Sequence, residues 1–129
     1  MVAPDALPSN VVQFVNDTID SIEQLELLVM LIESSDRWWD AVAAGHALGV
    51  SPGTTRRGLE RLATRNLLAV NLGNDVSYRF EPGSPTLRTT SEAFAAAFRR
   101  NPRALFRLAA HREKRAIQDF ADAFRIRRK

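Results

Sequence analysis

The sequence contains no cysteine, and this absence excludes several classes of site. Without thiols the chain has no disulfide framework, no thiolate zinc site and no thiol redox chemistry. It also lacks the uninterrupted apolar run of roughly 20 residues that a membrane-spanning helix needs. No secretory signal is visible, because a basic segment followed by an apolar core is missing at the N-terminus. We therefore expect a cytoplasmic protein with no membrane association.

Basic residues are absent from the first part of the chain. Every charged side chain before Arg37 is acidic, whereas 18 basic and 8 acidic side chains lie from Arg37 onward. A basic surface built from this later portion would attract phosphate backbones of any sequence. The alternative interpretation is that charged faces are simply solvated, and we interpret Asp20, Glu23 and Glu26 in that way. The asymmetry of the whole chain is better evidence than any single arginine.

The first 40 residues predict two helices and a short strand. We expect Ser9 to cap the first helix and Asp20 or Ser21 to cap the second, which carries a hydrophobic face. Trp38 and Trp39 are expected to form a short edge strand and to cover the core.

The segment from Asp40 to Glu81 has the pattern of a helix, a tight turn, a second helix and a hairpin. The first helix is predicted to end at Leu48 and Gly49. Ser51 and Pro52 then open the second helix, because Ser caps free N–H groups and Pro suits the first helical position. This helix spans residues 51–65, and the next residue, Asn66, can take the left-handed ending. Residues 73–75, Gly-Asn-Asp, predict the turn of a hairpin over residues 67–81, with one face packed and the other polar.

The helix over residues 51–65 is predicted to bury one face and expose a basic one. Helical geometry places Leu59 and Leu62 on the buried side and Arg57 and Arg61 on the opposite side. An exposed arginine can bind guanine O6 and N7, and hydroxyl side chains reach phosphates or base edges. The pattern therefore predicts a helix that enters the DNA major groove beside a wing. The candidate DNA-binding residues are Ser51, Thr54, Arg56, Arg57, Arg61, Arg65, Asn74 and Arg79.

Residues 48–68, LGVSPGTTRRGLERLATRNLL, resemble the reading helix of bacterial winged-helix regulators of the GntR and MarR kinds. The shared features are Leu-Gly-Val-Ser, a Thr-rich first turn, an Arg and Leu-x-x-Leu, and the resemblance covers roughly residues 40–81. It implies DNA contacts from Ser51, Thr54 and Arg56. The chain departs from the pattern at Pro52 and Gly53, which have no side chain that can read a base. This departure favours binding to the DNA backbone over strong base-specific readout.

These observations together predict an α+β fold, a winged helix-turn-helix with a two-stranded wing and extra C-terminal helices. We divide the chain into an N-terminal extension (residues 1–19), the winged core (20–82) and a C-terminal helical extension (83–129). This last extension either packs on the core or forms a dimer. Its aromatic side chains exceed what the core obviously needs and would suit a homodimer or another protein partner: Phe94, Phe98, Phe106, Phe120 and Phe124.

The sequence thus favours a DNA-binding regulator whose partner is double-stranded DNA. The alternative is a winged-helix adaptor that binds proteins and no DNA, because a fold alone does not settle function. We expect no enzymatic activity and no cofactor, since no phosphate-binding loop, nucleophile elbow or metalloprotease motif occurs. His46 and His111 are far apart in sequence and lack further ligands at metal spacing, so we expect no zinc site either.

Overall fold

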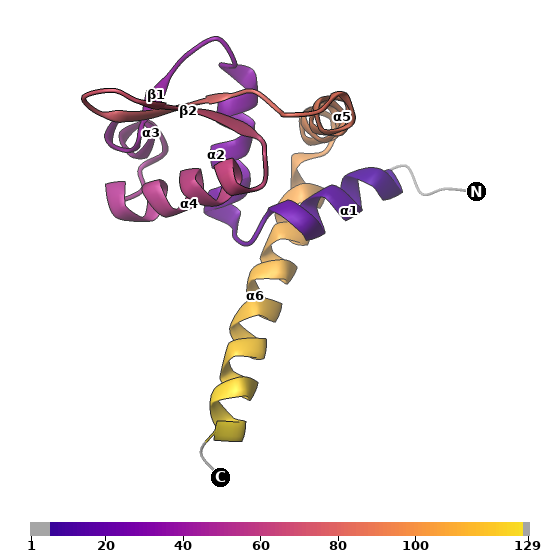
Figure 1. Ribbon diagram of the computed structural model, residues 1–129. Helices are drawn as coiled ribbons and strands as arrows, with labels where there is room; N and C mark the ends of the chain where they lie inside the picture. Colours follow the sequence, from indigo (N-terminus) through magenta and orange to yellow (C-terminus); the bar gives the residue numbers. More distant parts are fainter. Residues whose placement is uncertain (1–5, 128–129) are drawn as a thin grey trace.

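The computed structural model describes residues 6–127, and its side chains up to Ala123. Residues 1–5, at the start of the expected N-terminal extension, residues 128–129 and the side chain of Phe124 lie outside this description. The described part is an α+β structure with a winged-helix-like arrangement (Figure 1). Its elements are α1 (Ser9–Thr18), α2 (Ile22–Glu33), β1 (Trp39–Asp40), α3 (Ala41–Leu48), α4 (Pro52–Thr64), β2 (Leu68–Leu72), β3 (Val76–Phe80), α5 (Pro85–Arg100) and α6 (Pro102–Arg127).

The three strands form a small antiparallel sheet in the order β1-β3-β2. The hairpin register pairs Leu68 with Phe80 and Leu72 with Val76, so residues 73–75 form the turn, as the sequence predicts. Trp39 begins the edge strand and is buried, whereas its neighbour Trp38 is 38% exposed. The predicted edge strand is therefore confirmed, but only Trp39 covers the core.

The helix ends follow local capping rules with one exception. Ser21, rather than Asp20, caps α2 by accepting a hydrogen bond from the Gln24 N–H. Ser84 caps α5 in the same way. The prediction that Ser9 caps α1 is wrong, because Ser9 is already the first helical residue and Pro8 precedes it without a side-chain cap.

The turn between α3 and α4 depends on two glycines. Gly49 ends α3 in the left-handed conformation with φ of 70°, which glycine adopts without a side-chain clash. Gly45 lies against the turn, and a β-carbon there would come within 2.6 Å of the Val50 carbonyl oxygen. The two helices can therefore approach closely, which fixes the orientation of α4.

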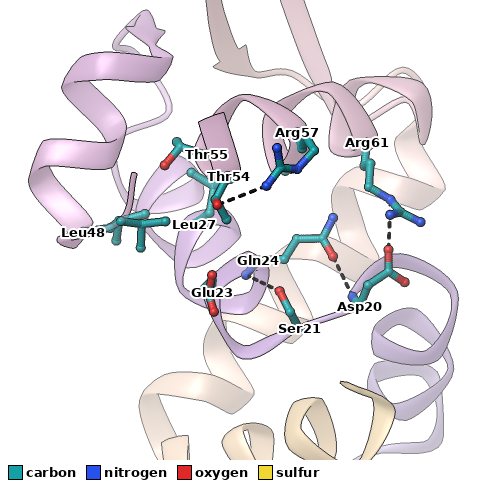
Figure 2. A pocket seen from close by; sticks show the side chains of 12 residues that line it. Asp20, Ser21, Glu23, Gln24, Leu27, Leu48, Thr54, Thr55, Arg57 and Arg61 are labelled. Atoms are coloured by element: carbon teal, nitrogen blue, oxygen red, sulfur yellow. Dashed lines mark hydrogen bonds and ion pairs between the residues drawn. The ribbon is translucent and has the colours of Figure 1, made fainter. Parts of the chain in front are cut away.

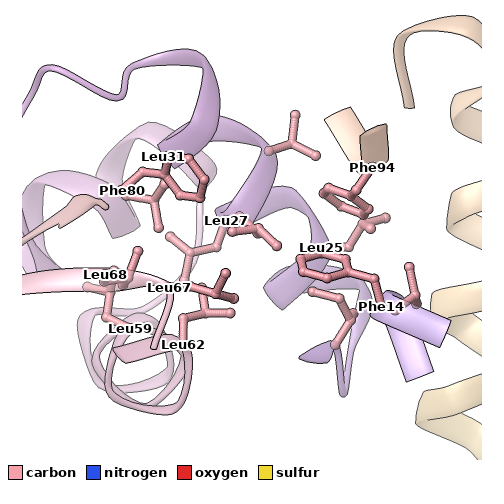
Figure 3. Close-up of a cluster of buried hydrophobic side chains, with 14 of the residues drawn as sticks. Phe14, Leu25, Leu27, Leu31, Leu59, Leu62, Leu67, Leu68, Phe80 and Phe94 are labelled. Carbon is pink, nitrogen blue, oxygen red and sulfur yellow. The ribbon is translucent and has the colours of Figure 1, made fainter. Parts of the chain in front are cut away.

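One continuous core, which runs in sequence from Val11 to Ala109, joins α1, α5 and the start of α6 to the other elements around α2 (Figure 3). Leu59, Leu62 and Leu67 pack on the α4 side of this core, and the rings of Phe14 and Phe94 meet at 5.3 Å on the other side. The helices α1 and α5 therefore share a core with the helix-turn-helix unit.

The long helix α6 divides into a packed half and a projecting half. Leu105 and Ala109 are buried, and Phe106 contacts Phe98 edge to face at 5.6 Å between ring centroids. Every described side chain from Lys114 to Ala123 is exposed, and this half extends away from the rest of the molecule (Figure 1). None of the described helices is both long and apolar enough to cross a bilayer.

Candidate nucleic-acid interface

The helix α4 presents its two faces as the sequence predicts. Thr55, Leu59 and Leu62 are buried, whereas Arg56 and Arg57 are exposed. Ser51 caps the helix, and its side chain accepts a hydrogen bond from the Thr54 N–H at 3.3 Å. At the other end Asn66 adopts the predicted left-handed conformation with φ of 67°. The burial of one leucine face thus turns the arginine face toward solvent.

The first two turns of α4 carry a small polar network. The Ser51 hydroxyl donates to Thr54 Oγ1 at 3.0 Å, and the Arg57 guanidinium donates to the same oxygen at 3.2 Å. Within the described part of the chain, no carboxylate forms an ion pair with Arg56 or Arg57. These two cations are therefore not neutralised by a contact with another described residue.

Arg61 and Arg65, two further candidate residues, meet the same carboxylate. Arg61 Nε and Arg65 Nη2 each lie 3.1 Å from Asp20 Oδ2. Arg65 also donates to the Thr18 carbonyl, and only 28% of its side chain is exposed, against 61% for Arg61. Arg65 therefore ties α4 to the corner between α1 and α2, while Arg61 stays accessible from outside.

The interpretation of Asp20 as a solvated acid is wrong. Glu23 and Glu26 are exposed as expected, but the Asp20 side chain is 26% exposed and also lies 3.8 Å from the Arg112 guanidinium of α6. Its position between α1 and α2 places it where both α4 and α6 reach it. The sequence offers no signal for this contact, because the three arginines lie in distant segments.

A small pocket separates the α2 N-terminus from α4 (Figure 2). Leu27, Leu48 and Val50 form its apolar side, and Arg57 and Arg61 reach over its polar side. Gln24 is buried at this site, and its Oε1 accepts a hydrogen bond from the Asp20 N–H at 2.6 Å. The pocket thus lies directly beneath the exposed arginines of α4.

The wing carries the last two candidate residues. Asn74 is exposed in the turn between β2 and β3. Arg79 pairs with Glu81 at 2.8 Å, and its guanidinium carbon lies 4.6 Å from the centre of the Trp38 ring. Stacking on an aromatic ring restrains a guanidinium without consuming its hydrogen-bond donors. Trp38, expected in the core, is thus a support for Arg79.

The prediction that one face of the hairpin packs holds only at its base. Leu68, Tyr78 and Phe80 are buried, but three apolar side chains nearer the turn are not, because the hairpin extends beyond the core (Figure 1). The exposed fractions are 43% for Val70, 79% for Leu72 and 45% for Val76.

These exposed side chains line a groove between α3, α4 and the hairpin, which we call the wing groove. Val42 of α3 is 61% exposed there, and Arg56 and Glu60 of α4 line it as well. Burial raises the pKa of the Tyr78 hydroxyl at the bottom of the groove, with a further contribution from Glu60 and an opposing one from Arg56. The Tyr78 hydroxyl is therefore protonated at neutral pH.

Within residues 6–127, no group of three or more His, Asp or Glu side chains is arranged to hold a metal ion.

No protein-family model matches the sequence, and no curated protein is detectably similar to it.

Two solved structures share the fold. A possible transcriptional regulator from Methanosarcina mazei Go1 aligns with a TM-score of 0.53 at 15% identity, covering 70% of this chain and 78% of that one. RV1404 from Mycobacterium tuberculosis aligns with a TM-score of 0.52 at 21% identity, covering 88% of this chain and 78% of that one. The fold of this chain is therefore shared with a possible transcriptional regulator.

Proposed function

We propose that the protein is a DNA-binding transcriptional regulator in which α4 enters the major groove and the β2–β3 hairpin acts as a wing. The observation that carries this proposal is the exposed arginine face of α4. Arg56 and Arg57 project from a helix whose opposite face is fixed in the core, and no carboxylate within the described residues pairs with them. A rigid helix with unneutralised guanidinium groups suits phosphate and guanine recognition.

The remaining candidate residues have supporting roles in this proposal. Ser51 and Thr54 lie at the α4 N-terminus, where hydroxyl and N–H groups can contact a phosphate. Asn74 and Arg79 would contact the backbone from the wing, and Arg65 holds α4 in place through Asp20 and Thr18. The proposal includes no catalysis, cofactor or metal.

The direct test is titration of a short fluorescent duplex of random sequence with the purified protein at several salt concentrations. We expect binding at low salt that weakens steeply between roughly 50 and 200 mM, because phosphate contacts release counterions. A protein that fails to bind any duplex at low salt would contradict the proposal.

A protein-interaction adaptor is the second candidate function, and the wing groove supports it. Val42, Val70, Leu72 and Val76 expose apolar surface in one place, and such patches often mark binding sites for other proteins. Asp40, Glu60 and Asp75 also line this groove and would repel DNA phosphates. The same titration separates the two functions, since an adaptor of this kind would not bind the duplex.

We further propose that the projecting half of α6 joins two copies of the chain, as a regulator of a two-fold operator requires. Ile117 and Phe120 are 66% and 73% exposed and lie three residues apart, so they share a helix face. Replacing both with glutamate should convert a dimer into a monomer without unfolding the protein, because neither side chain belongs to the core. Sedimentation velocity measures the change, with Gln118→Glu as the exposed control. A wild type that remains monomeric at every accessible concentration would rule out this interface.

A further inference from the structure

One carboxylate lies among three guanidinium groups where α1, α2, α4 and α6 meet. Asp20 contacts Arg61 and Arg65 of the α4 segment at 3.1 Å and Arg112 of α6 at 3.8 Å. Among the described residues, these arginines form no ion pair with any other acid. The Nε atom of Arg112 is buried and has no hydrogen-bond partner within the part of the chain that the structure describes. Asp20 therefore opposes three positive charges, and the cluster as a whole remains cationic.

The three arginines are held to different degrees. Arg65 has a second anchor in the Thr18 carbonyl, and 28% of its side chain is exposed. Among the described residues Arg61 forms an ion pair with Asp20 alone, and 61% of its side chain is exposed (Figure 2). Arg61 is thus the member of the cluster that can turn from Asp20 toward a phosphate at little structural cost.

Asp20 and a DNA phosphate are the same kind of binding partner for Arg61. Both present anionic oxygens to a guanidinium, so a phosphate that approaches α4 must share Arg61 with Asp20 or displace it. The Asp20 N–H donates to the buried Gln24 side chain at 2.6 Å, which holds the backbone of Asp20 in place and keeps its carboxylate within reach of Arg61. A fixed internal anion lowers the affinity of the nearby cation for an external one.

We propose that Asp20 competes with the DNA backbone for Arg61 and thereby limits the affinity of the protein for duplex DNA of any sequence. This inference rests on the proposed DNA-binding function and adds a residue that tunes it. Asp20 does not belong to α3 or α4 and is not expected to touch the DNA. Asp20 acts through Arg61, because its carboxylate holds the Arg61 guanidinium group in place.

The test compares Asp20→Asn with Asp17→Asn in titrations of a labelled random duplex at several salt concentrations. Asp17 is a matched control, because it is an exposed acid of α1 that bonds to Gln13 at 2.9 Å and pairs with no arginine of the cluster. Asp20→Asn should bind roughly two- to fivefold more tightly, the range that corresponds to partly exposed ion pairs. Its salt slope should steepen by about one, as for one added phosphate contact. Asp17→Asn should change neither quantity appreciably.

Equal tightening in both variants, or no tightening in Asp20→Asn, would overturn the competition while leaving the DNA-binding proposal intact. A wild type and Asp20→Asn that both fail to bind would overturn both proposals. In the Asp20→Asn background, Arg61→Ala should abolish the gain. A thermal melt of each variant shows whether it is folded.

If Asp20→Asn does not fold, a second comparison between two variants that retain Asp20 still tests the competition. In the wild-type background Arg61→Ala should reduce the affinity less than Arg57→Ala, because Asp20 already engages Arg61 and no carboxylate within the described residues engages Arg57. Equal losses for Arg61→Ala and Arg57→Ala would contradict the competition.

Discussion

Replacing Leu62 with alanine is expected to lower the free energy of unfolding by about 2–5 kcal/mol. Leu62 has no exposed surface and packs in the cluster that includes Leu59 and Leu67 (Figure 3). Truncation removes buried methyl groups and leaves a cavity that tightly packed neighbours fill only in part. Urea denaturation of the purified protein measures the loss.

The adjacent residue provides the control for this prediction. Arg61→Ala removes the ion pair with Asp20. The Arg61 side chain is 61% exposed, and ion pairs this accessible to solvent contribute at most about 1 kcal/mol. A comparison of the stability losses of Leu62→Ala and Arg61→Ala therefore tests which face of α4 is buried. Denaturation midpoints that fall by the same amount for both would mean that the buried and exposed faces of α4 are assigned incorrectly.

Replacing Arg57 with alanine is expected to weaken binding to a preferred duplex by about 1–3 kcal/mol, the usual cost of losing a bidentate contact to a base. Arg57 is exposed on α4, and among the described residues its guanidinium donates a hydrogen bond to Thr54 Oγ1 alone, so it can reach a base edge. Fluorescence titration of wild type and Arg57→Ala with preferred and random duplexes measures the loss of affinity for each kind of duplex.

Arg79→Ala should behave differently because Arg79 lies on the wing. We expect a uniform loss of affinity across sequences and a salt slope that is smaller by about one, as for one lost phosphate contact. Arg99→Ala is the control, since Arg99 is an exposed cation at the end of α5. If Arg99→Ala weakened binding as much as Arg57→Ala and Arg79→Ala, the binding surface would not be centred on α4 and the wing.

The sequence predicts the helix-turn-helix unit well because its determinants are local. Ser51 and Pro52 set the start of α4, Gly49 ends α3, and the spacing of Leu59 and Leu62 sets the buried face. Each of these effects acts over four residues or fewer, so it can be read from neighbouring positions. The hairpin turn at residues 73–75 follows in the same way.

The features that the sequence does not predict depend on contacts between distant segments. Asp20 and Arg65 are 45 residues apart, and nothing near Asp20 indicates that three arginines converge on it. The exposure of Leu72 depends on where the core ends, which alternation along a strand does not specify. For the same reason, the sequence alone could not distinguish the structural Arg65 from the accessible Arg57.

The most direct test of the account is a map of the backbone amide resonances of the protein during titration with duplex DNA at low salt. We predict that the largest shifts fall on residues 51–57 of the α4 segment and on the turn around Asn74, with small changes in α5. Shifts confined to α5 and α6, or no shift at any DNA concentration, would contradict the proposal that α4 and the wing bind DNA.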